Sequence, residues 1–106
     1  MRRILFICGK CRHRSPTAAE IFAPLEGWET DAAGLGDDAD SPLADEQIGW
    51  ATHLVVMEKR QLARLRRKFS GKLAGKRIIC LDVPDTYVFM QPELVELLRS
   101  RIGRIS

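Results

Sequence analysis

A cysteine and an arginine separated by five residues form the pattern in this chain with the clearest chemical meaning. Cys8 ends an apolar run, and Arg14 stands just before Ser15-Pro16, a pair that favours the start of a helix. A loop of this length at a helix N-terminus can turn several backbone N–H groups inward, which makes a site for a tetrahedral oxyanion. Arg14 can add a bidentate contact to two phosphate oxygens. The pattern therefore predicts a phosphate-binding loop.

The same loop predicts a nucleophile. A positive field favours thiolate over thiol at Cys8, and a thiolate can displace an alcohol from phosphorus to give a phosphocysteine that water later hydrolyses. We expect Ser15 to hydrogen-bond the sulfur and to stabilise it as the leaving group of the second step. A buried structural cysteine would leave the crowding of positive and titratable side chains in this loop unexplained. The predicted phosphate-binding residues are Gly9, Lys10, Cys11, Arg12, His13 and Arg14.

Three segments resemble low-molecular-weight protein tyrosine phosphatases. Cys8-x5-Arg14-Ser15-Pro16-Thr17-Ala18 is similar to the signature of that family and lies near the N-terminus, as it does there. Val56-Met57-Glu58-Lys59 resembles a strand-end segment of the family, and Val83-Pro84-Asp85-Thr86-Tyr87 resembles its late Asp-Pro-Tyr. The likeness is strongest to a short bacterial branch, described as predicted protein tyrosine phosphatases, and covers nearly the whole chain.

The resemblance implies a fold, a reaction and a proton donor. The fold is α/β: a three-layer sandwich, of the phosphotyrosine protein phosphatase I type, in which helices cover both faces of a four-stranded parallel sheet. The reaction is hydrolysis of a phosphorylated protein or a small phosphomonoester without a cofactor. Asp85 becomes the general acid and later the base that activates water. Asp82 is the rival, because it is closer to the end of the strand predicted at Arg77–Leu81. An aromatic wall of the pocket, or else part of the core, is expected from Tyr87, Trp28 or Trp50.

One residue departs from the family pattern and opens a second hypothesis. Cys11 stands where the family usually has Asn, and it creates a CxxC motif with Cys8. A thiol–disulfide oxidoreductase would use such a motif, and an arsenate reductase would need Cys11 or Cys80 as its resolving thiol. In a milder form, Cys11 traps oxidised Cys8 as a disulfide. Redox activity as the main function would leave Arg14-Ser15-Pro16-Thr17 without a role.

The charges are segregated along the chain and suggest a third hypothesis. The first 14 residues contain no acid, residues 15–58 contain no Lys or Arg, and residues 59–77 contain no acid. The last of these blocks could bind nucleic acid through Arg64, Arg66, Arg67 and Lys68, yet aromatic residues for base stacking are sparse there. A solvated basic helix is the simpler interpretation. A metal site is not favoured, since the Cys and His residues form no second closely spaced pair and zinc would occupy the nucleophile.

Strands that alternate with helices must position these groups. The apolar pattern predicts strands at Arg2–Cys8, Trp28–Ala33, His53–Met57 and Arg77–Leu81, and helices from Ser15, at Leu43–Thr52, at Glu58–Phe69 and at Pro92–Ile102. This alternation indicates a parallel sheet covered on both faces, with the loops after each strand along one edge. Ligands bind at that edge, near the strand where the order reverses. We therefore expect Cys8, Met57 and Asp82 to lie together.

Length and composition fit an ordinary small enzyme. The 106 residues, 45% apolar and 29% charged, predict one domain over 1–106 with a net charge of +3. No apolar run approaches the roughly 20 residues of a membrane span, and the N-terminal apolar run is too short for a signal peptide. Three cysteines, an odd number, do not suggest a disulfide framework. The expected compartment is the cytoplasm; the sequence predicts no oligomeric state.

Overall fold

The strands pair in parallel in the order β2-β1-β3-β4 within the computed structural model, which describes residues 1–105. Strand β1 spans Arg2–Cys8, β2 spans Trp28–Gly34, β3 spans His53–Val56 and β4 spans Arg77–Cys80. The helices between and after them are α1 (Arg14–Phe22), α2 (Asp45–Trp50), α3 (Lys59–Lys68) and α4 (Pro92–Arg101), followed by a short 3-10 helix, Ile102–Arg104. The predicted parallel α/β sandwich is confirmed, and element boundaries differ from the sequence prediction by one to two residues at most ends.

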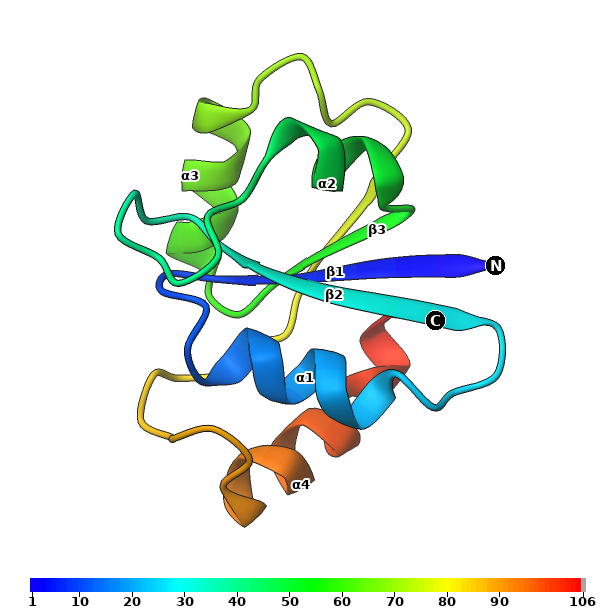
Figure 1. The fold of residues 1–106 in the computed structure, drawn as a ribbon, viewed down its shortest axis with the longest axis vertical. Helices are drawn as coiled ribbons and strands as arrows, with labels where there is room; N and C mark the ends of the chain where they lie inside the picture. Colours follow the sequence, from blue (N-terminus) through cyan, green and yellow to red (C-terminus); the bar gives the residue numbers. More distant parts are fainter. Residues whose placement is uncertain (106) are drawn as a thin grey trace.

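Two apolar cores lie on opposite faces of the sheet. Helices α1 and α4 cover one face and α2 and α3 cover the other (Figure 1). Side chains of β1 alternate between the cores, as a pleated strand requires: Ile4 and Phe6 pack toward α1 and α4, whereas Leu5 and Ile7 pack toward α2 and α3. All four are fully buried, which explains the continuous apolar run that marked this strand in the sequence.

The first helix begins one residue earlier than predicted. His13 holds the N-cap position and Arg14 is the first helical residue, so Ser15 lies inside the first turn and does not cap the helix. The helix ends at Phe22, with Ala23 as its C-cap and Pro24 next. This shift brings Arg14 onto the helix itself, where the helical backbone fixes the direction of its side chain.

The order of the strands reverses at β1, as predicted for a ligand site. Strand β1 lies between β2 and β3, and Ile7 is the partner of Val56 at the carboxyl end of the pair. The loop after β1 leads to α1 on one face, and the loop after β3 leads to α3 on the other face (Figure 1). A crevice at this end of the sheet is the expected result. None of the helices in residues 1–105 combines the length and apolar character needed to span a bilayer.

Candidate active site

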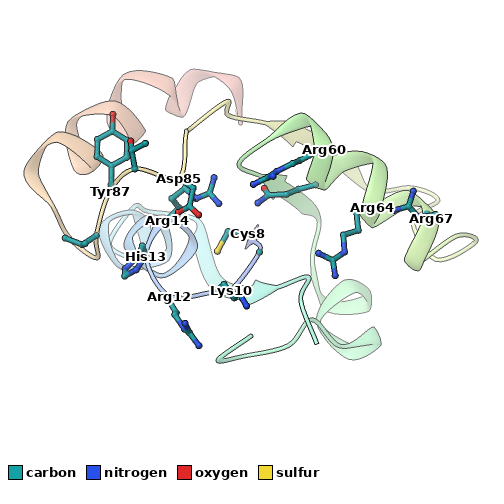
Figure 2. Close-up of a pocket in the computed structure, with 14 residues that line it drawn as sticks. Cys8, Lys10, Arg12, His13, Arg14, Arg60, Arg64, Arg67, Asp85 and Tyr87 are labelled. Atoms are coloured by element: carbon teal, nitrogen blue, oxygen red, sulfur yellow. The ribbon is translucent and has the colours of Figure 1, made fainter. Parts of the chain in front are cut away.

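A cavity of about 800 Å³ opens at the carboxyl end of β1, with Cys8 in its wall (Figure 2). Figure 2 shows the Cys8 sulfur between Tyr87 and His13 on one side and three arginines of α3 on the other. Only 3% of Cys8 is exposed, so the sulfur is reached through this cavity. The other lining residues are Gly9, Lys10, Arg12, Arg14, Arg60, Gln61, Arg64, Arg67, Asp85, Thr86 and Val88.

The loop of residues 8–14, which we call the cysteine loop, has its carbonyl groups turned away from the sulfur. The carbonyl oxygens of residues 8, 9 and 10 accept hydrogen bonds of 2.8–2.9 Å from the backbone N–H groups of residues 35, 36 and 40. Because a trans peptide points its N–H opposite to its C=O, the N–H groups that follow these carbonyls face the other way. One of them, on Cys11, donates to the Cys8 sulfur at 3.1 Å. The cysteine loop thus has three carbonyls engaged by segment 35–40 and at least one amide, that of Cys11, directed at the sulfur.

Two glycines allow the segment 34–42 to hold the cysteine loop so closely. A Cβ atom added at Gly34 would come within 2.9 Å of the Gly9 carbonyl oxygen and 3.1 Å of the Cys11 nitrogen. A Cβ atom at Gly36 would come within 3.1 Å of the same Gly9 oxygen. Real Cβ atoms essentially never come within 3.0 Å of another heavy atom, so a side chain at Gly34 would displace the cysteine loop, whereas the 3.1 Å approach at Gly36 is tight. The sequence is rich in Gly and Asp over residues 34–42, but it indicated no role for this segment.

Arg14 is buried beside the nucleophile and held by two acceptors. Its side chain is 4% exposed, and Nη1 donates to the Val83 carbonyl oxygen at 2.8 Å and to the Glu58 carboxylate. Burial alone would raise the pKa of Glu58, but the hydrogen bond and charge of Arg14, joined by Arg60, lower it below the usual value. Glu58 was missed as a site residue. Its only signal in the sequence was an acid placed directly after a buried strand.

The two candidate acids lie in different places. Asp85 lines the cavity of Cys8, its carboxylate 3.7 Å from Arg14 Nε, and it is 58% exposed. Asp82 borders a separate shallow hollow and pairs with Arg104 at 3.0 Å; this hydrogen bond, with one from Cys80, lowers the pKa of Asp82. Cys8 and Met57 lie together as predicted, in one core cluster at neighbouring strand ends, whereas Asp82 does not join Cys8 at its cavity. Met57 is fully buried in the core, and Asp82 turns away through a backbone φ of 55°.

The charged side chains of the cysteine loop are tied to their surroundings. The Lys10 ammonium pairs with Asp38, and Arg12 Nε lies 3.1 Å from the Asp40 carboxylate. Both cations are half-exposed at the rim of the cavity. The structure therefore brings Lys10 and Arg12 to the cavity, as predicted, with their charges already balanced by acids.

The start of α1 also positions the loop of residues 82–91. His13 Nδ1 accepts the N–H of Phe89 at 3.1 Å, and Thr17 Oγ1 accepts the N–H of Met90 at 2.9 Å. These two bonds join segments more than 70 residues apart and hold the loop that carries Asp85 against the cysteine loop. His13 thus has an observed structural role in addition to lining the cavity.

Ser15 and Cys11 differ from what the sequence predicted. The Ser15 hydroxyl is fully buried and has no hydrogen-bond partner among residues 1–105, so the predicted bond to Cys8 is absent; the amide of Cys11 takes that place. Cys11 has a positive φ of 57° and packs in the core. Burial, reinforced by Cys8 and nearby carboxylates, raises the pKa of Cys11 to about 12. Burial also raises the pKa of Cys80.

The aromatic candidates divide between site and core. Tyr87 lines the cavity. Trp28 packs edge-on against Phe22 with ring centroids 6.0 Å apart, and Trp50 packs against the opposite core. His53 is buried, with Nδ1 2.7 Å from the Thr52 hydroxyl. Within the described part of the chain, no group of three or more His, Cys, Asp or Glu side chains could hold a metal ion.

Known structures share this architecture. No protein-family model and no curated protein matches the sequence. YwlE arginine phosphatase from Geobacillus stearothermophilus is 23% identical, with a TM-score of 0.70 over 93% of this chain and 89% of that one. SP-PTP, a low molecular weight protein tyrosine phosphatase from Streptococcus pyogenes, is 12% identical, with a TM-score of 0.77 over 100% and 94%. A low molecular weight protein tyrosine phosphatase from T. tengcongensis is 20% identical, with a TM-score of 0.73 over 97% and 94%. The chain has the fold of these phosphatases.

Proposed function

We propose that this protein is a cysteine-dependent phosphatase of the low-molecular-weight protein tyrosine phosphatase type. The observation that carries the proposal is the arrangement at Cys8: its sulfur accepts an N–H from its own loop at 3.1 Å and shares a cavity with the buried guanidinium of Arg14. Amide donors and a guanidinium around one sulfur suit a thiolate and a tetrahedral dianion equally. The fold shared with the known phosphatases supports the same conclusion.

The reaction proceeds in two displacements at phosphorus. The Cys8 thiolate attacks phosphorus while the amides of the cysteine loop and Arg14 bind the equatorial oxygens. The bond from phosphorus to the ester oxygen breaks, and Asp85 protonates the departing oxygen. Water then attacks the phosphocysteine, Asp85 accepts a proton from it, and the sulfur–phosphorus bond breaks to release phosphate and the thiolate. Sulfur, guanidinium and carboxylate supply every step, so the reaction needs no cofactor.

Ser15 fits this scheme as a hydroxyl that gains a hydrogen-bond partner during the reaction. A buried hydroxyl without a hydrogen bond, such as that of Ser15, lowers the stability of the fold by roughly 1–3 kcal/mol. A hydroxyl kept at this cost indicates a functional role. We infer that Ser15 donates to Cys8 when sulfur becomes the leaving group.

The substrate class is a phosphorylated protein side chain or a small phosphomonoester. Similar structures include proteins named as tyrosine phosphatases and as arginine phosphatases, which makes phosphotyrosine and phosphoarginine the first substrates to assay. Tyr87 offers an aromatic wall to either. We place the reaction in the cytoplasm, whose reducing conditions keep a nucleophilic thiol free.

The redox alternative has less support. Thiol–disulfide exchange requires a thiolate as the attacking group. Burial raises the pKa of Cys11 and of Cys80, and the thiol of Cys80 also forms a hydrogen bond with Asp82 that raises its pKa. Neither thiol is therefore a ready resolving nucleophile near neutral pH. A redox enzyme would also leave the buried Arg14 beside Cys8 without a function.

One set of assays separates the two activities. Hydrolysis of an aryl phosphate is measured beside reduction of arsenate and of a disulfide, with wild type, Cys8→Ser and Cys11→Ala. A phosphatase loses hydrolysis in Cys8→Ser and keeps much of it in Cys11→Ala. Loss of disulfide or arsenate reduction in both variants, with no hydrolysis in wild type, would overturn the proposal.

A further inference from the structure

The wall of the cavity opposite Tyr87 carries a row of three arginines from α3. Arg60, Arg64 and Arg67 are spaced by four and three residues, which places them on one face of the helix (Figure 2). The buried side of the same helix carries Leu65. The row begins near Cys8 and extends away from it by about 10 Å along the helix axis, given a rise of about 1.5 Å per residue.

The charges of this row are not balanced within the described chain. Arg60 pairs with Glu58 at 2.7 Å. Arg64 and Arg67 have no hydrogen bond or ion pair to any of residues 1–105, whereas the cavity-lining cations of the cysteine loop all pair with acids. Two arginines without partners among residues 1–105, in the wall of the cavity where we propose that phosphate binds, favour a ligand with further negative charge.

The dimensions favour a polypeptide. A cavity of about 800 Å³ exceeds what a single phosphorylated side chain fills, and a row of about 10 Å matches about three residues of extended chain. The opposite wall presents Tyr87 and Val88, which suit an apolar residue on the other side of the phosphate. Nucleic acid fits this cavity less well, because α3 offers no aromatic side chain along the row for base stacking.

We propose that Arg64 and Arg67 bind acidic side chains that flank the phosphorylated residue of a polypeptide substrate. The inference rests on the proposed phosphatase function and adds a preference for substrates with acidic residues beside the phosphorylated one. Arg60 and Arg14 both pair with Glu58, so the row of α3 continues from the phosphate site, and the unpaired charge lies at Arg64 and Arg67. Acidic residues on one side of the phosphorylated residue, and not on both, should be preferred.

The test uses three phosphotyrosine peptides of equal length. One has aspartates before the phosphotyrosine, one has them after it, and one has asparagines at both places. Since each exposed ion pair contributes modestly, wild type should hydrolyse one acidic peptide with a kcat/KM about 2-fold to 30-fold above that of the neutral peptide. Arg64→Glu and Arg67→Glu should each reduce this ratio, and the double variant should bring it below one.

Arg66→Glu provides the matched control. Arg66 is exposed, lies in the same last turn of α3, has no ion-pair partner among the described residues and does not line the cavity. Arg66→Glu changes the net charge and the end of the helix as Arg67→Glu does, but it leaves the cavity wall intact. It should therefore leave the ratio of kcat/KM between the preferred acidic peptide and the neutral peptide unchanged. Equal kcat/KM for all three peptides in wild type, or an equal loss in Arg66→Glu and Arg67→Glu, would overturn the inference.

Peptide binding to Cys8→Ser separates this inference from the proposed function. If wild type hydrolyses neither aryl phosphate nor peptide, but Cys8→Ser still binds the acidic phosphopeptide through Arg64 and Arg67, the proposed function fails and the arginine row stands. If aryl phosphate is hydrolysed without preference among peptides, the function stands and the row fails. An oligonucleotide that displaces the acidic peptide at physiological salt would assign the row to nucleic acid and overturn the inference.

Discussion

Replacing Glu58 by Gln tests whether a charged partner is needed to keep Arg14 beside the nucleophile. The Arg14 side chain is 4% exposed, and the Glu58 side chain that pairs with it is 22% exposed, so this carboxylate is the better shielded of its two acidic neighbours. Gln retains an oxygen acceptor and nearly the same shape. The substitution therefore removes the charge from the contacts with Arg14 and Arg60 and changes little else.

The magnitude follows from the type of hydrogen bond that is lost. A bond to a charged group contributes about 1.5–3 kcal/mol and a neutral one about 0.5–1.5 kcal/mol, so Glu58→Gln should lower the free energy of unfolding by about 1 kcal/mol at pH 7. For a domain of this size, that corresponds to a Tm lower by about 4–8 °C.

The pH dependence has a definite sign. The fold lowers the pKa of Glu58, because Arg14 and Arg60 together outweigh the opposing effect of burial. A carboxyl whose pKa is lower in the folded state stabilises the protein above its unfolded pKa of about 4.3, and this contribution disappears as pH falls through the folded value. The difference in Tm between wild type and Glu58→Gln should therefore be full at pH 7 and should shrink as the pH falls below about 4.3.

Thermal unfolding at pH 7, 5 and 3.5 measures this difference. Glu20→Gln is the control, since Glu20 is exposed on α1 and has no hydrogen bond or ion pair in the described residues; it should change stability by less than about 0.5 kcal/mol. The reasoning fails if Glu58→Gln unfolds at the wild-type temperature at pH 7. It fails equally if the difference persists unchanged at pH 3.5.

Three further pairs of substitutions test the cysteine loop and the acid. Gly34→Ala puts a Cβ 2.5 Å from a side chain and 2.9 Å from the backbone of the cysteine loop. It should therefore destabilise the protein by about 1–3 kcal/mol in chemical denaturation and weaken inhibition by phosphate. Gly49→Ala, whose added Cβ has nothing within 4 Å, should stabilise the protein by up to about 1 kcal/mol. Cys11→Val should cost about 1–2 kcal/mol more than Cys11→Asn, since a β-branched residue tolerates a φ of 57° poorly; equal stabilities would contradict this. Asp85→Asn should slow aryl phosphate hydrolysis by about 10²–10⁴-fold while Asp82→Asn does not, and the reverse result would transfer the acid role.

The sequence was sufficient for the elements and for their arrangement as a parallel sheet covered on both faces. A strand buried on both faces is continuously apolar, and a helix buried on one face is apolar at every third or fourth residue. Both patterns can be recognised in the sequence. The spacing from Cys8 to Arg14 was equally local, since both residues belong to one loop and the helix after it. Patterns of this kind depend on neighbours in the chain, and the sequence displays them directly.

The support around that loop could not be predicted in the same way. Glu58 reaches Arg14 across 44 positions, and Gly34 packs against Gly9 across 25, so both contacts exist only once the strands are placed side by side. The role of Ser15 as a helix cap was wrong for a related reason. A serine hydroxyl suits the N-cap position, but the cap in the structure is His13 and the helix begins at Arg14, the last residue of the cysteine loop.

The segregated charges of the sequence find their explanation in the same long-range contacts. Acids from the block without Lys or Arg pair with cations of both basic blocks: Asp38 with Lys10, Asp40 with Arg12, Glu58 with Arg14, Asp37 with Lys68 and Asp45 with Lys72. Folding thus neutralises the cysteine loop, while Arg64 and Arg67 stay unpaired in the described chain. A phosphate that enters must compete with Glu58 and Asp85 for a buried Arg14, whereas an acidic flank on α3 displaces only water and counterions. Exposed charges are screened within about 8 Å at physiological salt and buried ones much less. Raising the salt concentration should therefore abolish the preference for acidic peptides well before it abolishes inhibition by inorganic phosphate; a parallel loss of both would mean that Arg14 and the α3 row are equally open to solvent.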